Sequence, residues 1–216
     1  MYMKVLRTMM MCLLCMAIAT FALTSCLSDD DDDEVTAVLT PTEKTQQINA
    51  MEGFYNGHVY FDNDTTHAMD SVATTWYVTA ADSVLSIPAF PVSCLANSVS
   101  HSTAKAVLKA APDQHFNAVL HPFWNINKDG GYYTFMMVPK ENSLSFQVEL
   151  EGKTHQVMLN YATSMNAYNS YGQQVVVYTS GAFSQPKISA YLLVKDISID
   201  YTAYTCNGIF LLGGTK

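Results

Sequence analysis

The chemistry of this chain begins at Cys26, because this cysteine ends the run Leu23-Thr24-Ser25-Cys26. An apolar residue, two small residues and a cysteine make up a lipobox. A signal peptidase needs small side chains beside the bond that it cuts, and the cysteine thiol is the nucleophile that receives a diacylglyceryl group. The pattern predicts cleavage between Ser25 and Cys26. It also predicts that Cys26 carries two or more acyl chains, which hold a protein stably on a membrane.

The residues before Cys26 have the composition of an export signal. Lys4 and Arg7 form a short positive region, and the run from Met9 to Leu23 has no charge. A transmembrane helix needs roughly 20 apolar residues, so this run is too short for one and fits a signal peptide over residues 1–25. An ordinary secretory signal cut at a nearby bond, in which Cys26 has no special role, is the alternative.

An acidic run follows the cysteine directly, with the sequence Leu27-Ser28-Asp29-Asp30-Asp31-Asp32-Asp33-Glu34. A stretch of this charge density stays solvated and cannot pack, so it serves as a tether. The run also resembles the Ser-Asp-rich export signal that follows the lipidated cysteine of surface lipoproteins in Bacteroides and its relatives. The resemblance implies an outer-membrane location that faces the cell exterior. A plain spacer facing the periplasm is the alternative.

The charge of the mature chain excludes one class of partner. Removal of residues 1–25 leaves 191 of the 216 residues, with nine lysines, no arginine and 19 acidic residues, which gives a net charge near −10. Binding of nucleic acid depends on neutralising phosphates with basic side chains, so nucleic acid is not an expected partner. The guanidinium fork that usually clamps carboxylates and phosphates is also absent.

Two cysteines besides Cys26 remain after cleavage, Cys94 and Cys206. A disulfide between them suits an exported domain and would contribute on the order of 4–5 kcal/mol in the chain-entropy model. Two buried free thiols that act as small apolar side chains are the alternative. The sequence leaves both readings open.

Motifs of known catalysts are missing. The chain has no His-Glu-x-x-His run and no Gly-x-Ser-x-Gly elbow, and its six histidines are scattered. A thiolate nucleophile at Cys94 or Cys206 would need a histidine that the sequence does not place. Glu149 and Glu151 lie beside a hairpin turn, where acids are usually solvated and do not face each other as in glycosidases. We therefore expect no enzyme, no metal and no cofactor.

The segment best suited to contact a ligand is Tyr161–Tyr171, which carries Tyr161, Tyr168 and Tyr171 among asparagines and serines. Tyrosine offers a flat apolar face with a hydroxyl group, and asparagine offers both a donor and an acceptor. This mixture suits contact with a glycan or with another protein. An ordinary loop, in which Asn, Ser and Gly serve the turn geometry, is the alternative.

Two helices are predicted in the mature chain. Thr40-Pro41-Thr42-Glu43 combines a capping threonine, a proline at the first helical position and a glutamate at the third, and Gly53 ends this helix after Met51. A second helix is expected from Thr103 to Ala111, where Pro112 ends it.

Alternation of apolar and polar residues predicts strands elsewhere. Leu144–Leu150 and Val157–Tyr161 flank the turn Glu151-Gly152, which sets Phe146 opposite Val157 and Leu144 opposite Leu159. Val72, Trp76 and Val78 share one face of another strand, and a turn at Asn63-Asp64 would set His67 opposite Tyr60. Further strands are expected over residues 54–61, 67–79, 83–87, 132–138, 175–179, 188–194, 197–204 and 209–212, whereas 115–129 and 162–174 are expected to be irregular.

About nine short strands with two short helices predict a mainly β domain of the α+β class. An antiparallel barrel and a sandwich both fit this pattern. We expect residues 26–39 to form the lipidated cysteine and its tether, and residues 40–216 to form a single domain.

Several of these features together resemble the DUF4840 group of Bacteroidetes lipoproteins. They are the lipobox followed by acids, the helix before Met51-Glu52-Gly53-Phe54-Tyr55-Asn56-Gly57, and Phe90-Pro91-Val92-Ser93 leading into a helix such as Ala104–Ala111. The resemblance covers roughly residues 40–213. It implies a lipoprotein without an assigned function and supplies no catalytic residues.

These observations favour a surface-anchored, non-enzymatic domain that is held on the membrane by its lipid. The expected ligand is a glycan, a small apolar molecule or an outer-membrane protein. A structural or accessory subunit of an outer-membrane complex or surface appendage is the alternative.

The anchor is tested by replacing the cysteine, Cys26→Ala, in cells that process lipoproteins. We expect the variant to lose the mass of its acyl chains and to leave the membrane fraction, because no other anchor is predicted. Intact mass spectrometry and fractionation measure both effects. A variant that is as membrane-bound as the parent, with neither protein lipidated, would contradict the prediction.

Overall fold

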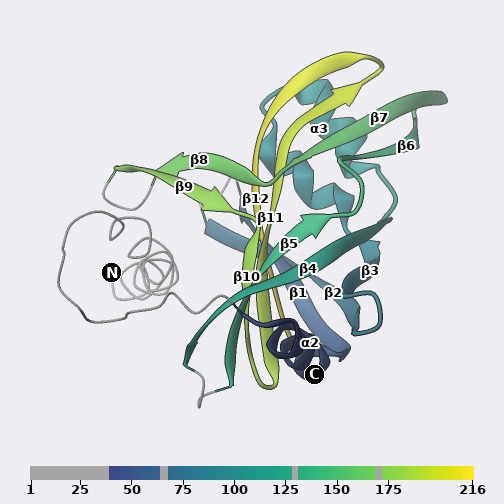
Figure 1. Ribbon diagram of the computed structural model, residues 1–216. Helices are drawn as coiled ribbons and strands as arrows, with labels where there is room; N and C mark the ends of the chain where they lie inside the picture. Colours follow the sequence, from purple (N-terminus) through teal and green to yellow (C-terminus); the bar gives the residue numbers. More distant parts are fainter. Residues whose placement is uncertain (1–38, 64–67, 128–130, 169–171) are drawn as a thin grey trace. The chain divides into compact units, whose positions relative to one another are not determined.

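A computed structural model describes residues 39–63, 68–127, 131–168 and 172–216 (Figure 1). The chain divides into two compact units. The large unit holds residues 38–165 and 178–216 and contains most of the strands. The small unit includes residues 166–177, which contribute to the hairpin of β8 (Ser164–Tyr168) and β9 (Gln174–Tyr178).

Eight antiparallel strands of the large unit close into a barrel, in the order β10-β5-β4-β3-β2-β1-β12-β11. The pairing of β10 with β11 completes the ring. Closure gives each of these eight strands a neighbour on both sides, so that none of them is an edge strand. The strands are β1 (Gly53–Asn63), β2 (Ala68–Thr79), β3 (Val84–Phe90), β4 (Gln114–Asn127), β5 (Tyr132–Pro139), β10 (Ser180–Ser184), β11 (Lys187–Ile199) and β12 (Thr202–Thr215).

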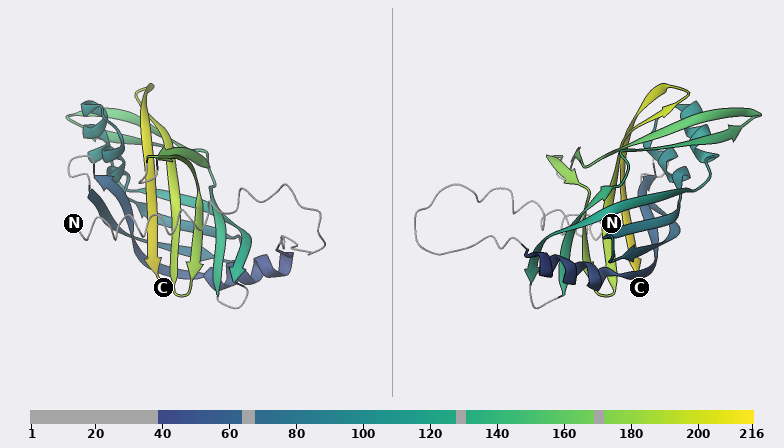
Figure 2. Two further views of the ribbon diagram at one scale, coloured as in Figure 1. Left: turned by 90° about the vertical axis from the view of Figure 1, so that its left-hand side faces the viewer. Right: turned by 45° about the vertical axis from the view of Figure 1, so that its right-hand side comes forward.

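The strand β11 pairs with β12 along its length, and on its other side it has two different partners in succession. Residues 187–190 pair with β10, and residues 193–199 pair with β7 (Lys153–Ala162). The register shifts between Val194 and Asp196, just beyond the change of partner. The hairpin of β6 (Ser143–Leu150) and β7 thereby extends the sheet beyond the barrel, as both views of Figure 2 show.

Helices lie at both ends of this unit. The helix α2 (Pro41–Met51) begins with a complete capping box between Thr40 and Glu43, and it lies at the end of the barrel that holds the last residue (Figure 2). The 3-10 helix η1 (Val92–Ser98) and the helix α3 (Ser102–Lys109) contact each other at the opposite end, where α3 also contacts β6 and η1 contacts β12. No helix of the described ranges has the length and apolar character to cross a membrane.

Two large side chains of the barrel interior rest on glycines. Trp76 of β2 is fully buried. A Cβ atom added to Gly57 of β1 would lie 2.4 Å from its ring atom Cη2, and one added to Gly214 of β12 would lie 2.5 Å from Cζ2. Phe135 occupies the space above Gly181 in the same way, with its Cζ 2.4 Å from the position of an added Cβ. Large and small residues thus alternate across the interior, as a small barrel requires.

The sequence predictions hold best for the helices and for the hairpin of β6 and β7. The mainly β fold with two α-helices is confirmed, and the barrel is the correct architecture of the two that were expected. Phe146 pairs with Val157 and Leu144 with Leu159, as predicted. The turn residues Glu151 and Gly152 have φ of 52° and 73°, which a tight two-residue turn requires.

The first hairpin has a different register from the predicted one. Asn63 pairs with Ala68 and Tyr60 pairs with Ser71, so His67 is not opposite Tyr60. His67 itself lies outside the described residues. The connection between β1 and β2 has four residues, 64–67, instead of two, and the longer connection shifts every pair.

Three further expectations about strands were wrong. Residues 115–129 do not form an irregular stretch, because β4 runs from Gln114 to Asn127 with register shifts on both sides of Trp124. Proline is tolerated in a strand at such irregularities, which is why Pro122 does not end it. The predicted loop 162–174 contains β8, and β11 continues past Lys195 to a turn at Asp200 and Tyr201, whose φ values are 50° and 65°.

Replacement of the barrel glycine, Gly57→Ala, tests the contact with Trp76. We expect the free energy of unfolding to fall by about 3 kcal/mol, because the new methyl group would lie 2.3 Å from the Gly213 carbonyl oxygen as well as against the indole. Urea denaturation measures the change. Gly213→Ala is the matched control, since its Cβ meets only the Tyr60 ring, at 3.2 Å, and should cost less than about 1 kcal/mol. Equal effects of the two variants would contradict this account of the core.

Candidate functional site

Two buried side-chain donors, one in the barrel and one on β7, have no hydrogen-bond partner among the described residues, and the acceptor Gln47 Oε1 of α2 has none either. The first donor is Nε1 of Trp76, whose side chain is fully buried. The ring of Tyr55 stacks on the indole with a centroid distance of 6.2 Å, and the Tyr55 hydroxyl group donates to the backbone oxygen of Met51. The described residues therefore supply an acceptor to Tyr55 but none to the neighbouring Trp76.

The second group is the hydroxyl group of Tyr161, on β7. The Phe116 ring meets the Tyr161 ring edge to face at 5.4 Å, and burial raises the pKa of Tyr161 with a smaller contribution from the Glu141 charge. Buried polar groups of native proteins almost always have a partner, in the protein, in water or in a ligand. The predicted role of Tyr161 as a contact residue stays a prediction.

The other predicted contact residues are not described. The side chain of Tyr168 and the whole of Tyr171 lie outside the described residues, as do Ser25, Cys26, Ser28 and the tether residues Asp29, Asp30, Asp31, Asp32 and Asp33. The predicted roles of these residues stay predictions.

Lys216 lies between α2 and the barrel. Its Nζ donates to the Ala50 backbone oxygen at 2.8 Å and lies 5.6 Å from the Tyr55 ring centroid and 5.4 Å from that of Phe183. A cation is favourable near the C-terminal carbonyl groups of a helix and over aromatic faces. Partial burial lowers the pKa of Lys216, and the charge of Glu52 opposes this shift. The contact joins residues 166 positions apart, so no local pattern in the sequence indicates it.

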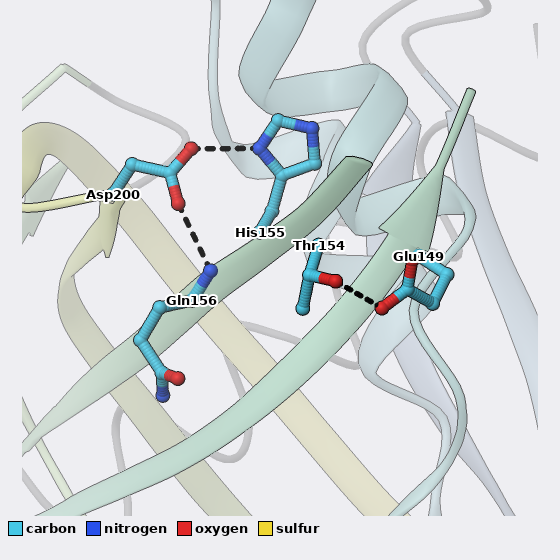
Figure 3. Close-up of polar contacts among 5 residues, drawn as sticks. All are labelled: Glu149, Thr154, His155, Gln156 and Asp200. Atoms are coloured by element: carbon cyan, nitrogen blue, oxygen red, sulfur yellow. Dashed lines mark hydrogen bonds and ion pairs between the residues drawn. The ribbon is translucent and has the colours of Figure 1, made fainter. Parts of the chain in front are cut away.

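A polar cluster ties the turn between β11 and β12 to β7 (Figure 3). His155 Nδ1 lies 2.7 Å from Asp200 Oδ2, and the Gln156 N–H group donates to Asp200 Oδ1 at 2.9 Å. The Asp200 N–H group donates back to the Gln156 backbone oxygen at 2.9 Å. Nearby, the Thr154 hydroxyl group donates to a Glu149 carboxylate oxygen. The Asp200 carboxylate thus continues the ladder of β7 and β11 past the end of the strand.

The cluster contains a carboxylate and a histidine, Asp200 and His155, as a catalytic triad does. The described residues show no nucleophile that is hydrogen-bonded to this histidine. A carboxylate can orient a histidine for base catalysis, and such a base then acts on a nucleophile or a bound water. No hydrogen bond from His155 to a serine, threonine or cysteine is present among the described residues. Within the same residues, no group of three His, Cys, Asp or Glu side chains could hold a metal ion. The contacts that are present hold β7 against the turn, and we call the pair of His155 and Asp200 the latch.

Cys94 of η1 and Cys206 of β12 are both buried and carry free thiols in the structure. Burial raises the pKa of Cys94 to about 12 and that of Cys206 to about 11. Charge on Cys206 would raise the pKa of Cys94 further, and Ser98 donates to Cys206. Thiols with such values are poor nucleophiles at neutral pH. The geometry agrees with the alternative of two small apolar side chains, and a disulfide between them stays a prediction.

The fold and these sites define a class of protein, a closed antiparallel barrel with a sheet extension and an aromatic interior. The chain belongs to the family described as Domain of unknown function (DUF4840), whose model matches residues 50–198. The match confirms the family resemblance. No curated protein and no solved structure matches the chain.

Replacement of the latch carboxylate, Asp200→Asn, tests the contact with His155 and Gln156. The hydrogen bond from His155, followed by that from the Gln156 backbone, lowers the pKa of Asp200 in the folded state. Its stabilising effect is therefore complete above the unfolded pKa of about 3.9 and is lost as the pH falls through the folded pKa. We expect the parent protein to be more stable than the variant at neutral pH, and we expect the difference to decrease below about pH 4 and to vanish once the pH is below the folded-state pKa.

Urea denaturation between pH 2.5 and pH 7 measures this difference, and carbon NMR of the Asp200 carboxyl group measures its pKa directly. A stability difference that persists at the acid end, or a carboxyl pKa that is not lowered, would contradict the proposed latch.

Proposed function

We propose that this chain is a lipid-anchored surface lipoprotein whose barrel binds a small, mainly apolar ligand and catalyses no reaction. The observation that supports the proposal is the pair of buried donors without partners, Trp76 Nε1 and the Tyr161 hydroxyl group. A ligand that carries a carbonyl or hydroxyl oxygen would accept a hydrogen bond from either group.

The size and chemistry of the interior support a ligand of this kind. A barrel of eight strands is just wide enough for side chains to fill it or to hold one small ligand. The buried polar residues of the described part are uncharged, namely Gln47, Thr74, Ser86, Thr179 and Ser180. An interior without a buried charge favours an uncharged, mainly apolar molecule, since a charge would need a partner there.

The amino-terminal segment supports a location at the cell surface. The lipobox ends at Cys26, and the described part of the chain begins at the buried Leu39. The 12 residues between these positions let the two Cα atoms lie at most about 45 Å apart in an extended chain. A barrel held this close to the outer membrane is suited to capture a ligand from the environment.

An accessory subunit of an outer-membrane complex is the second candidate function. The exposed apolar pair of Phe54 on β1 and Tyr77 on β2 favours it, because the two side chains are cross-strand neighbours with exposed fractions of 55% and 37%. Chemical cross-linking on intact cells separates the candidates. A stoichiometric outer-membrane protein recovered with the chain would favour the accessory role, and recovery of the chain alone would favour a free-standing binder.

Removal of one hydroxyl group, Tyr161→Phe, tests the proposed ligand site. We expect binding of prodan, a neutral naphthalene dye with a single ketone oxygen, to weaken by about tenfold, because one hydrogen bond is worth about 1.4 kcal/mol. Fluorescence titration measures the affinity. Equal affinities of the parent and the variant, or no binding of prodan to the parent, would contradict the proposal.

The same variant makes an opposite prediction for stability without ligand. Tyr161→Phe removes a buried hydroxyl group that has no partner, so the free energy of unfolding should stay equal or rise. Tyr55→Phe is the matched control, because the Tyr55 hydroxyl group donates to Met51 and its removal should cost about 1 kcal/mol. A loss for Tyr161→Phe as large as that for Tyr55→Phe would show that the chain satisfies this hydroxyl group itself.

A further inference from the structure

The strand β6 forms the free edge of the extended sheet. The sheet ends with β6, which pairs only with β7 among the described residues. Figure 2 shows the hairpin of these two strands projecting beyond the strands of the barrel. The helix α3 contacts β6, and Phe146 and Val148 form the buried side of the strand.

The geometry of the turn decides which backbone groups of β6 are unpaired. In a two-residue hairpin the residues that flank the turn, here Leu150 and Lys153, exchange both hydrogen bonds. The pattern alternates along the strands, so Ser145, Gln147 and Glu149 direct their N–H and C=O groups away from β7. All three residues are exposed.

The edge carries few of the features that prevent another strand from pairing with it. Natural proteins protect long edges with lysine, proline, bulges or a covering element. The strand β6 spans eight residues, Ser143–Leu150, in regular register with β7, and it holds no proline and no lysine. Its one charged residue, Glu149, lies next to the turn and accepts a hydrogen bond from Thr154.

We propose that β6 pairs with β6 of a second copy of this chain, antiparallel and about a two-fold axis at Gln147. This register sets Gln147 opposite itself, Ser145 opposite Glu149 and Phe146 opposite Val148. No two like charges of β6 face each other in it. The three residues with free backbone groups would form about six hydrogen bonds across the axis.

The side chains on the inner face match in the same register. Leu144 of one copy lies opposite Leu150 of the other, and both leucines are only half-buried in the single chain. Pairing would cover them and continue the apolar face of the sheet across the axis. If the two-fold axis lay at Glu149, the Glu149 side chains of the two copies would face each other. Repulsion between these like charges disfavours that register.

The contact is small, so the pair forms where the local concentration is high. A stable interface usually buries about 1,200–2,000 Å², and two edge strands bury less than this. Confinement of many copies to one membrane surface would supply the concentration. This step alone rests on the lipid anchor of the proposed function, and a failure of the anchor shows separately in the Cys26→Ala fractionation.

Cysteine cross-linking of the full chain in intact cells tests the position of the axis. The variant Gln147→Cys should form a disulfide-linked dimer after treatment with copper phenanthroline, because residue 147 meets itself at the axis. The control Asn56→Cys is also exposed but lies on β1 and is paired on both sides, with Thr215 of β12 and Thr75 of β2, and should give a dimer yield at least tenfold lower. Equal yields, or a cross-linked product with the mass of a different protein, would overturn the proposal.

A charge exchange at the same position separates self-pairing from non-specific contact. Two differently tagged copies are co-expressed, cross-linked and recovered through one tag. The cross-linker is a photoreactive reagent that does not depend on amines or carboxylates, because the variants change the number of these groups. Gln147→Lys in both copies should lower co-recovery by about fivefold, and Gln147→Lys paired with Gln147→Glu should restore it. Unchanged recovery in the first pair, or no restoration in the second, would overturn the two-fold register.

A proline at the edge provides a block that leaves the ladder with β7 intact. Gln147→Pro removes an N–H group that faces away from β7, and proline is tolerated on edge strands in this orientation. We expect complete loss of the dimer with an unchanged circular dichroism spectrum. The control Gln147→Thr keeps the N–H group and should keep the dimer. A dimer that persists in the folded proline variant would overturn pairing through β6.

Discussion

The partner change along β11 is the constraint on which the rest of the structure depends. The strand β11 has 13 residues and β10 has only five, so the second half of β11 extends past β10 and pairs with another strand on that side. The hairpin of β6 and β7 provides that neighbour, and the register shift between Val194 and Asp196 accommodates the change. One strand thereby closes the barrel and also begins the sheet that extends from it. The free edge at β6 is a direct consequence, because a sheet that leaves a barrel must end somewhere.

Closure of the barrel sets the second constraint, which is the limited width of the interior. Trp76 fits only because Gly57 and Gly214 on the neighbouring strands have no side chains, and Phe135 fits because of Gly181. Close packing of this kind fixes the aromatic rings, so Tyr55 can reach the end of α2 and Lys216 can lie over two rings. The same packing leaves the indole N–H group without an acceptor from the chain.

The sequence predicted features that depend on neighbours along the chain and missed those that depend on distant contacts. The capping box at Thr40 and the hairpin around Glu151 and Gly152 are local, and both were correct. The alternation that placed Trp76 on an inner face was also correct. The prediction of an irregular stretch over 115–129 was wrong, because only the pairing with neighbouring strands shows where a register shift accommodates Pro122 in β4. The contacts of Asp200 with β7 and of Lys216 with α2 span 44 and 166 positions and left no local signal.

Some backbone and side-chain groups of this molecule have hydrogen-bond partners within the chain, and others have none among the described residues. The first kind stabilises the fold, and the second kind is where we propose contacts with other molecules. At the latch, Asp200 completes the ladder of β7, and at the end of α2, Lys216 satisfies a terminal carbonyl group. Polar side chains of the chain form these hydrogen bonds, although both positions are partly exposed and water could form them instead. The described residues supply no partner to the buried indole of Trp76 or to the free edge of β6, where an unpaired group costs more or attracts another strand. The two proposals, a ligand inside the barrel and a second copy at the edge of the sheet, both start from such unpaired groups.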